Sequence, residues 1–129
     1  MSQDQASGAA ANEWGRETAR QIASRIGAEM LGSGSNEASL DGKRVVIKCA
    51  GRATDSVGVT FKMLETLDAV IAAFQLDDGS FELWSLPGDV FRAEMRDTRS
   101  RGAAAGKVGL VRRAVFSSRG TLVGRVRTD

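Results

Sequence analysis

The stretch that decides the fold is residues 37–48, EASLDGKRVVIK. Its centre, Asp41-Gly42, is the kind of residue pair that most strongly predicts a two-residue hairpin turn, because both positions of that turn need a positive φ. A two-residue turn also fixes which residues face each other across the two strands. We therefore expect an antiparallel hairpin with Glu37 opposite Val46.

Alternation along the two strands places their side chains on two faces. One face is apolar and is predicted to pack on the core; its residues are Ala38, Leu40, Val45, Ile47 and Cys49. The residues of the other face are Glu37, Ser39, Arg44, Val46 and Lys48. Glu37 and Lys48 form either a cross-strand ion pair on a solvated face or a site for phosphodiester hydrolysis, in which the carboxylate holds Mg²⁺ and the lysine steadies water or phosphate.

Hydrophobic periodicity predicts the elements around this hairpin. Before it, apolar residues recur every four positions over residues 13–31, which predicts an amphipathic helix that ends at the glycine-rich turn after it. The polar residues 1–12 are expected to be a flexible tail. After the hairpin we expect an extended piece, a helical turn, an apolar strand buried on both faces, and a further strand. These four elements lie over residues 57–61, 62–67, 68–76 and 81–86.

The C-terminal part has weaker patterns. Residues 90–96 fit either a helix or a strand, and the Gly/Ala/Arg-rich residues 99–106 are expected to be a loop. Apolar runs over 108–116 and 121–126 predict a third hairpin around the four polar and glycine residues between them. This order of elements indicates an α/β chain of mixed α+β type, with an N-terminal helix, a hairpin, a central mixed sheet and a basic C-terminal hairpin.

Composition excludes several kinds of chemistry. The 129 residues are enough for one domain and contain no histidine, which rules out histidine zinc sites and Ser-His-Asp or Cys-His catalysis. The single cysteine, Cys49, permits no internal disulfide and fits a reducing cytoplasm. No stretch approaches the about 18 apolar residues of a membrane span, and residues 1–12 lack the features of a signal peptide. We therefore expect a cytoplasmic protein without a membrane partner.

Charge is distributed unevenly along the chain. Residues 1–89 hold 8 Lys/Arg and 13 Asp/Glu, whereas residues 90–129 hold 10 and 3, a net charge of +7. Nine of those ten basic residues are arginine, which binds phosphate through two parallel hydrogen bonds. A DNA-binding surface is therefore predicted on the C-terminal hairpin, from Arg112, Arg113, Arg119, Arg125 and Arg127. The alternatives are a solvated basic strand edge and a surface for an acidic protein partner.

The order of helix, glycine-rich turn and hairpin, together with residues 36–48, resembles the core of the PD-(D/E)XK nuclease superfamily, which has the restriction-endonuclease-like fold. Members place an acidic residue on one strand and a D/E-x-K motif on its hairpin partner. The resemblance extends over about residues 13–86. It implies a single nuclease-like domain over 13–129, with its core over 13–96 and a basic extension over 97–129. It also implies a homodimer that hydrolyses DNA with Mg²⁺ or Mn²⁺.

Three residues match catalytic positions of this superfamily. Glu37 matches the first acidic position, Lys48 the lysine, and Glu17 an acidic residue that often faces the site from the first helix. Val46 departs from the pattern, because members have Asp or Glu there as the second metal ligand. Either Glu17 or Glu65 supplies the missing ligand beside Glu37, or the chain is a catalytically inactive nucleic-acid-binding or protein-interaction module of the same fold.

Overall fold

The structure, a computed structural model, describes residues 3–32, 35–97 and 107–128. Within these residues the strands form two sheets, one six-stranded with the order β1-β2-β3-β5-β6-β9 and one three-stranded with the order β4-β8-β7. The expected α/β class with a mixed central sheet is confirmed. In chain order the elements are α1 Gln3–Ile26, β1 Glu29–Met30, β2 Glu37–Leu40, β3 Lys43–Ala50, β4 Ser56–Thr60, α2 Phe61–Leu64, β5 Ala69–Gln75, β6 Phe81–Pro87, α3 Gly88–Glu94, β7 Arg96–Asp97, β8 Val108–Arg112, α4 Arg113–Arg119 and β9 Thr121–Val126.

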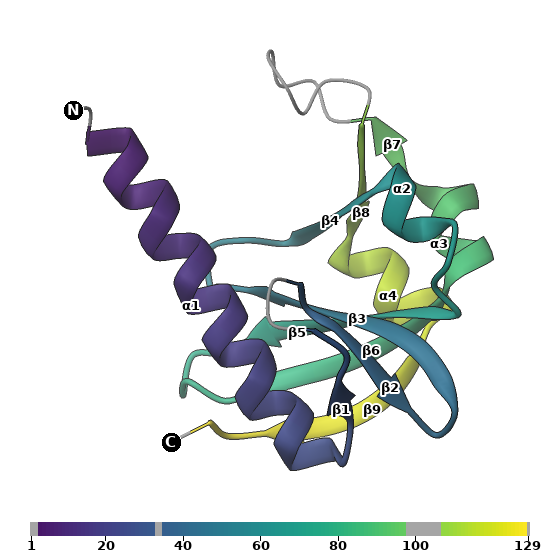
Figure 1. Ribbon diagram of the computed structural model, residues 1–129, viewed down its shortest axis with the longest axis horizontal. Helices are drawn as coiled ribbons and strands as arrows, with labels where there is room; N and C mark the ends of the chain where they lie inside the picture. Colours follow the sequence, from purple (N-terminus) through teal and green to yellow (C-terminus); the bar gives the residue numbers. More distant parts are fainter. Residues whose placement is uncertain (1–2, 33–34, 98–106, 129) are drawn as a thin grey trace.

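These elements stack in three layers. Helix α1 lies along one face of the six-stranded sheet, and the three-stranded sheet lies on the other face together with α2, α3 and α4 (Figure 1). The central strands β3 and β5 run parallel, and the chain between them passes through β4 and α2 in the second layer. The other neighbouring strands of this sheet are antiparallel. In the described ranges, none of the helices combines the length and the apolar character that crossing a membrane requires.

The hairpin β2–β3 has the predicted turn and register. Glu37 pairs with Val46, and the two-residue turn is made by Asp41 and Gly42. Their φ angles of 53° and 79° lie in the left-handed region that this turn requires at both positions. The expectation of an antiparallel hairpin over these residues is therefore confirmed.

The sheet face toward α1 is filled by small and branched apolar residues. Ile47, on the apolar face predicted for the hairpin, is fully buried there. At the edge of this layer Trp14 of α1 packs on Phe81, with ring centroids 6.1 Å apart, and stays 40% exposed. The buried cluster consists of Ala19, Ile22, Ala23, Ala38, Val45, Ile47, Ala69, Ile71, Ala73, Phe81 and Leu83.

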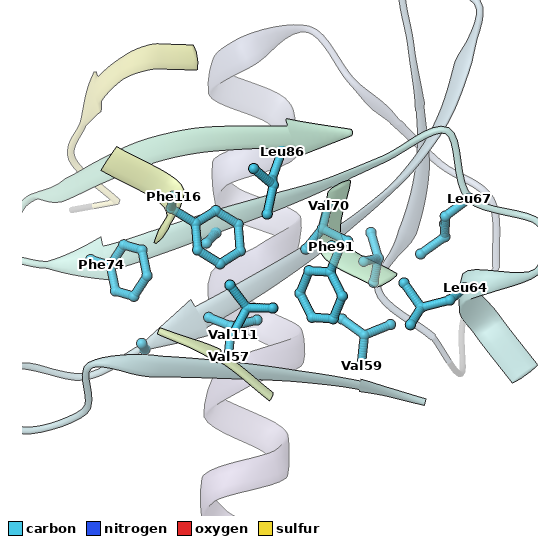
Figure 2. Close-up of a cluster of buried hydrophobic side chains, with 13 residues drawn as sticks. Val57, Val59, Leu64, Leu67, Val70, Phe74, Leu86, Phe91, Val111 and Phe116 are labelled. Atoms are coloured by element: carbon cyan, nitrogen blue, oxygen red, sulfur yellow. The ribbon is translucent and has the colours of Figure 1, made fainter. Parts of the chain in front are cut away.

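The opposite face packs against the second layer through larger side chains. Phe116 lies edge-on to Phe74 and to Phe91, with ring centroids 5.8 Å and 6.2 Å apart. Figure 2 shows these rings together with valines of β4 and β8 that point into the same cluster. Because the sheet is covered on both sides, β5 is buried along almost its whole length, as its apolar composition predicted.

Helix α1 begins and ends earlier than predicted. It begins at Gln3, so the expected tail is helical from that residue onward; the alanine-rich sequence there favours a helix. It ends at Ile26 because Gly27 takes a φ of 78°, which leaves the helical path. The Ala28 N–H then donates to the Ala23 carbonyl at 2.8 Å and closes the helix end. The glycines after Met30, expected to end the helix, instead follow the short strand β1.

The middle of the chain follows the sequence pattern closely. The strands expected over residues 68–76 and 81–86 are confirmed as β5 and β6, the extended piece as β4, and the helical turn as α2. Residues 88–94 form α3, so the segment that fitted either a helix or a strand is mainly helical. The loop expected over 99–106 lies outside the described residues.

The prediction of a C-terminal hairpin over residues 108–126 is wrong. Residues 113–119 form α4, and the strands on either side of it, β8 and β9, belong to different sheets. The physical reason is long-range packing: Phe116 is fully buried between two other phenylalanines, and this burial outweighs the local preference of an apolar run for a strand. Residues 107–128 thus complete both sheets rather than forming an extension beside the core.

Candidate functional site

The candidate site begins on the hairpin face that looks toward the second layer. Val46, the residue between Glu37 and Lys48 on this face, is fully buried in the phenylalanine-rich cluster. Its strand neighbours in register are Val70 of β5 and then Leu86 of β6, both also fully buried. The position at which the superfamily has a metal-binding carboxylate is therefore a packing position in this protein.

Glu37 is held within its own hairpin by two donors. Arg44 donates from Nη2 to Oε2 of Glu37 at 3.1 Å, and the Ser35 hydroxyl donates to the same oxygen at 3.4 Å. The carboxylate side chain is only 17% exposed. A cross-strand ion pair thus exists on this face, as one interpretation of the sequence held, but its cation is Arg44 rather than Lys48.

Lys48 points into the same layer and is half-buried. Burial lowers the pKa of its ammonium group, and the neighbouring Cys49 opposes that shift without cancelling it. Cys49 lies on the α1 side of the sheet, where burial raises the pKa of its thiol to about 12. Lys48 forms no ion pair with any residue that the structure describes. It is a partly desolvated cation at the margin of an apolar layer.

A surface hollow brings Glu37 close to one of the two candidate substitute ligands. Glu65, directly after α2, lines a hollow of about 320 Å³ together with Glu37 and Lys62. A second hollow of about 440 Å³ shares Lys62 and Glu65 with the first and adds Lys107. The two hollows therefore place two carboxylates and two lysines around α2.

Glu17, the other candidate ligand, lies elsewhere. It belongs to α1, which covers the opposite face of the sheet from the side chain of Glu37. Its side chain is 59% exposed and pairs with Arg20 of the next helical turn at 3.4 Å. The structure thus does not bring Glu17 to the hairpin face, because the face of α1 that meets the sheet is the one carrying Ala19, Ile22 and Ala23.

The donor groups do not fit the magnesium site that the resemblance implies. That site needs two carboxylates on neighbouring strands, and Val46 offers no oxygen at the second position. Glu37 already accepts two hydrogen bonds, and Glu65 approaches only across the hollow. In the described part of the chain, no group of three or more Asp, Glu or Cys side chains is placed to hold a metal ion.

Four of the five arginines predicted to track DNA pair with carboxylates of the chain itself. Arg113 and Arg125 both approach Glu82, with Nη2 of each 3.3 Å and 3.8 Å from a carboxylate oxygen. Arg119 pairs with Glu94, and Arg127 with Asp78 at 3.2 Å. Arg112 alone of the five is exposed and outside any ion pair with a described residue.

The acidic partners of these arginines were missed by sequence reasoning. A hydrogen bond from the Trp84 indole at 2.8 Å is the main cause that lowers the pKa of Glu82, and Arg113 and Arg125 add to it. Hydrogen bonds from Ser80 lower the pKa of Asp78, again with help from arginines. The available signal was the acidic excess of residues 1–89, which balances the basic C-terminal part once the chain is folded.

Comparison with protein-family models and with curated proteins gives no match for this chain. Only a resemblance of the hairpin residues and of the elements around them suggests the PD-(D/E)XK superfamily.

Proposed function

We propose that this chain is a nucleic-acid-binding module of nuclease-like architecture that does not hydrolyse its ligand. The observation that carries the proposal is the burial of Val46. A hydrolytic centre of the kind suggested by Glu37 and Lys48 needs a second carboxylate between them. In that place this chain has an apolar side chain that helps to join the two main layers.

The distribution of cations supports nucleic acid as the ligand. Besides the paired arginines, the second layer carries basic side chains that form no ion pair with a described carboxylate. They are exposed and can bind phosphate, and half of them are arginine. These residues are Lys62, Arg96, Lys107 and Arg112.

A second candidate function is hydrolysis with a relocated ligand set. It is favoured by one specific observation, the hollow that Glu37 and Glu65 line together with Lys62. Divalent magnesium is often held by one or two carboxylates and the phosphates of its substrate, so two carboxylates near each other deserve a direct test.

One pair of assays separates these functions. Binding of a labelled DNA duplex is measured by fluorescence anisotropy at several salt concentrations, and nicking of supercoiled plasmid is measured with Mg²⁺ and with Mn²⁺. We expect binding that weakens steeply with salt and no nicking. Absence of binding at about 50 mM salt would reject the binding module. Nicking that stops with chelator and is lost in both Glu37→Ala and Glu65→Ala would replace it with the hydrolase.

A further inference from the structure

We propose that the outer face of the three-stranded sheet β4-β8-β7 is the surface that binds the backbone of duplex DNA. This inference depends on the proposed function and names the surface that performs it. It moves the predicted interface away from the paired arginines of α4 and β9 and onto a face that keeps only Arg112 of the five arginines predicted from the sequence.

Alternation along the strands defines this face. In β4 and β8 every second residue is buried, and these inward residues include Val57, Val59 and Val111, which point into the cluster of Figure 2. The residues between them therefore point away from the core. Arg96 of β7 is exposed and lies opposite Leu110, so it shares this outward face. The outward residues are Ser56, Gly58, Thr60, Arg96, Val108, Leu110 and Arg112.

The charge of this face has one sign. Its outward residues include two arginines and no Asp or Glu, and neither arginine forms an ion pair with a described residue. Arg96 and Arg112 are diagonal neighbours, because Arg112 lies two residues after the partner of Arg96 on β8. Diagonal neighbours in a sheet are about 7–8 Å apart, so both side chains can reach one nucleic-acid backbone.

Two lysines extend the positive charge beyond one end of the sheet. The backbone N–H of Phe61 donates to the carbonyl of Lys107 at 2.8 Å, which ties the start of β8 to the start of α2. Lys62 follows directly, and both lysines line the hollow of about 440 Å³. Glu65 is the carboxylate on that hollow, so the positive charge is strongest on the sheet itself.

The side chains between the arginines favour a duplex over a single strand. The outward positions hold no aromatic residue, whereas non-specific single-strand binding uses aromatic rings as stacking platforms. In the centre, Leu110 and Val108 lie over Gly58, where a Cβ would meet their methyl groups at 3.0 Å and 3.1 Å. The face is therefore a shallow apolar strip with arginines beside it, suited to contact with phosphates and sugars rather than with bases.

The test compares two double variants of equal charge change. Arg96→Ala/Arg112→Ala removes the two arginines of the face. Arg16→Ala/Lys43→Ala removes two other exposed cations, on α1 and at the hairpin turn, that form no ion pair with a described residue. Duplex affinity is measured between about 50 and 200 mM salt. We expect the first variant to flatten the slope of log affinity against log salt by about 1.8, and the control by less than half of that.

The outcomes separate the surface from the function. If the wild-type protein binds duplex DNA but the Arg96/Arg112 variant keeps the wild-type slope, this surface is wrong while the binding function stands. Equal flattening in both variants would likewise overturn the surface, because it would show an effect of net charge alone. If the wild-type protein binds no DNA, the proposed function itself is wrong. Tighter binding of a single strand of the same length would overturn the assignment to duplex DNA.

Discussion

The two faces of the six-stranded sheet are covered by different means. On one face α1 approaches through alanines and branched residues such as Ala23 and Ile22. On the other face, phenylalanines and valines join the sheet to a second sheet and three short helices. The charged residues of the candidate site, Glu37 and Lys48, belong to this second face. A sheet face that is already filled by core packing leaves its charged side chains at its margins.

The largest expected effect is a loss of stability when a buried side chain is removed from the centre of the second face. Phe116→Ala should lower the free energy of unfolding by about 3–5 kcal/mol, because it removes a fully buried ring that contacts two others. Trp14→Ala, on the α1 face, should cost about 1 kcal/mol, because this ring is 40% exposed. Chemical denaturation of both variants measures the difference. Equal losses would show that the two faces contribute to stability in the same way.

The next effect concerns the position that the superfamily uses for metal. Val46→Glu places a carboxyl group in an apolar cluster and should lower the free energy of unfolding by about 3 kcal/mol. Part of the cost is avoided when the buried carboxyl takes up a proton, so the loss should be larger at pH 8 than at pH 5. Val123→Glu, at a position 40% exposed on β9, is the matched control and should stay within about 0.5 kcal/mol of wild type.

The same variant also bears on catalysis. If Val46 were simply a lost ligand in an otherwise open site, Val46→Glu should restore metal-dependent nicking of plasmid DNA. We expect no nicking, since the new carboxyl lies inside the packed layer rather than in the hollow beside Glu37. A stable Val46→Glu protein that cuts DNA would reverse this conclusion.

A third and smaller effect is the pH dependence of stability, which Cys49 on one face of the sheet and Lys48 on the other should change in opposite directions. The pKa of the Cys49 thiol is raised from 9.0 to about 12, so between these values the unfolded chain releases a proton that the folded chain keeps. Stability should therefore fall as pH rises above 9, and Cys49→Ala should remove that part of the fall. Lys48 acts in the opposite direction: its pKa is lowered, so the cost of burying its charge is greatest at neutral pH and is relieved as pH rises toward 10.5.

Denaturation between about pH 7 and pH 11 tests both signs. Lys48→Met should gain most over wild type at neutral pH, and its advantage should shrink as pH rises. Identical pH profiles for wild type and Cys49→Ala would show that the thiol is not shielded in the folded protein. Such a result would place Cys49 at the surface rather than under α1.

The parts of the fold that could be predicted depend on residues that are close to one another in the sequence. Asp41-Gly42 specifies its hairpin because the turn itself demands positive φ at two positions. The apolar strand β5 is recognised because both of its faces need burial. The region of α4 was not predictable in this way, since its conformation depends on a contact between Phe116 and residues 25 and more positions away in the sequence. Local patterns cannot report such a contact.

The candidate site was predictable only in its outline. The register of the hairpin correctly placed Glu37 and Lys48 on one face, but it could not show that Val46 would be covered by a second sheet. Likewise, the number of arginines predicted the charge of the C-terminal part, but it did not predict which carboxylates these arginines would pair with. Those partners, such as Glu82 and Asp78, lie 31 or more positions away in sequence from the arginines that donate hydrogen bonds to them, and only the folded sheet joins them.

The smallest expected effect decides what Glu37 does. As the partner of Arg44, it should show a coupling energy of about 0.2–1 kcal/mol in a double-mutant cycle of Glu37→Ala and Arg44→Ala, measured by denaturation. As a metal ligand, it should instead make the protein more stable when Mg²⁺ or Mn²⁺ is added, because a ligand that binds only the folded state stabilises it by mass action. We expect to measure this coupling energy. We also expect that adding Mg²⁺ or Mn²⁺ does not raise the Tm of the wild-type protein more than it raises that of Glu37→Ala. If Mn²⁺ raises the Tm of wild type but not of Glu37→Ala or Glu65→Ala, these carboxylates hold the metal and the hydrolase becomes the better account. A coupling energy near zero without a metal effect would leave Glu37 with neither role, and the ion pair would then be a surface contact without energetic weight.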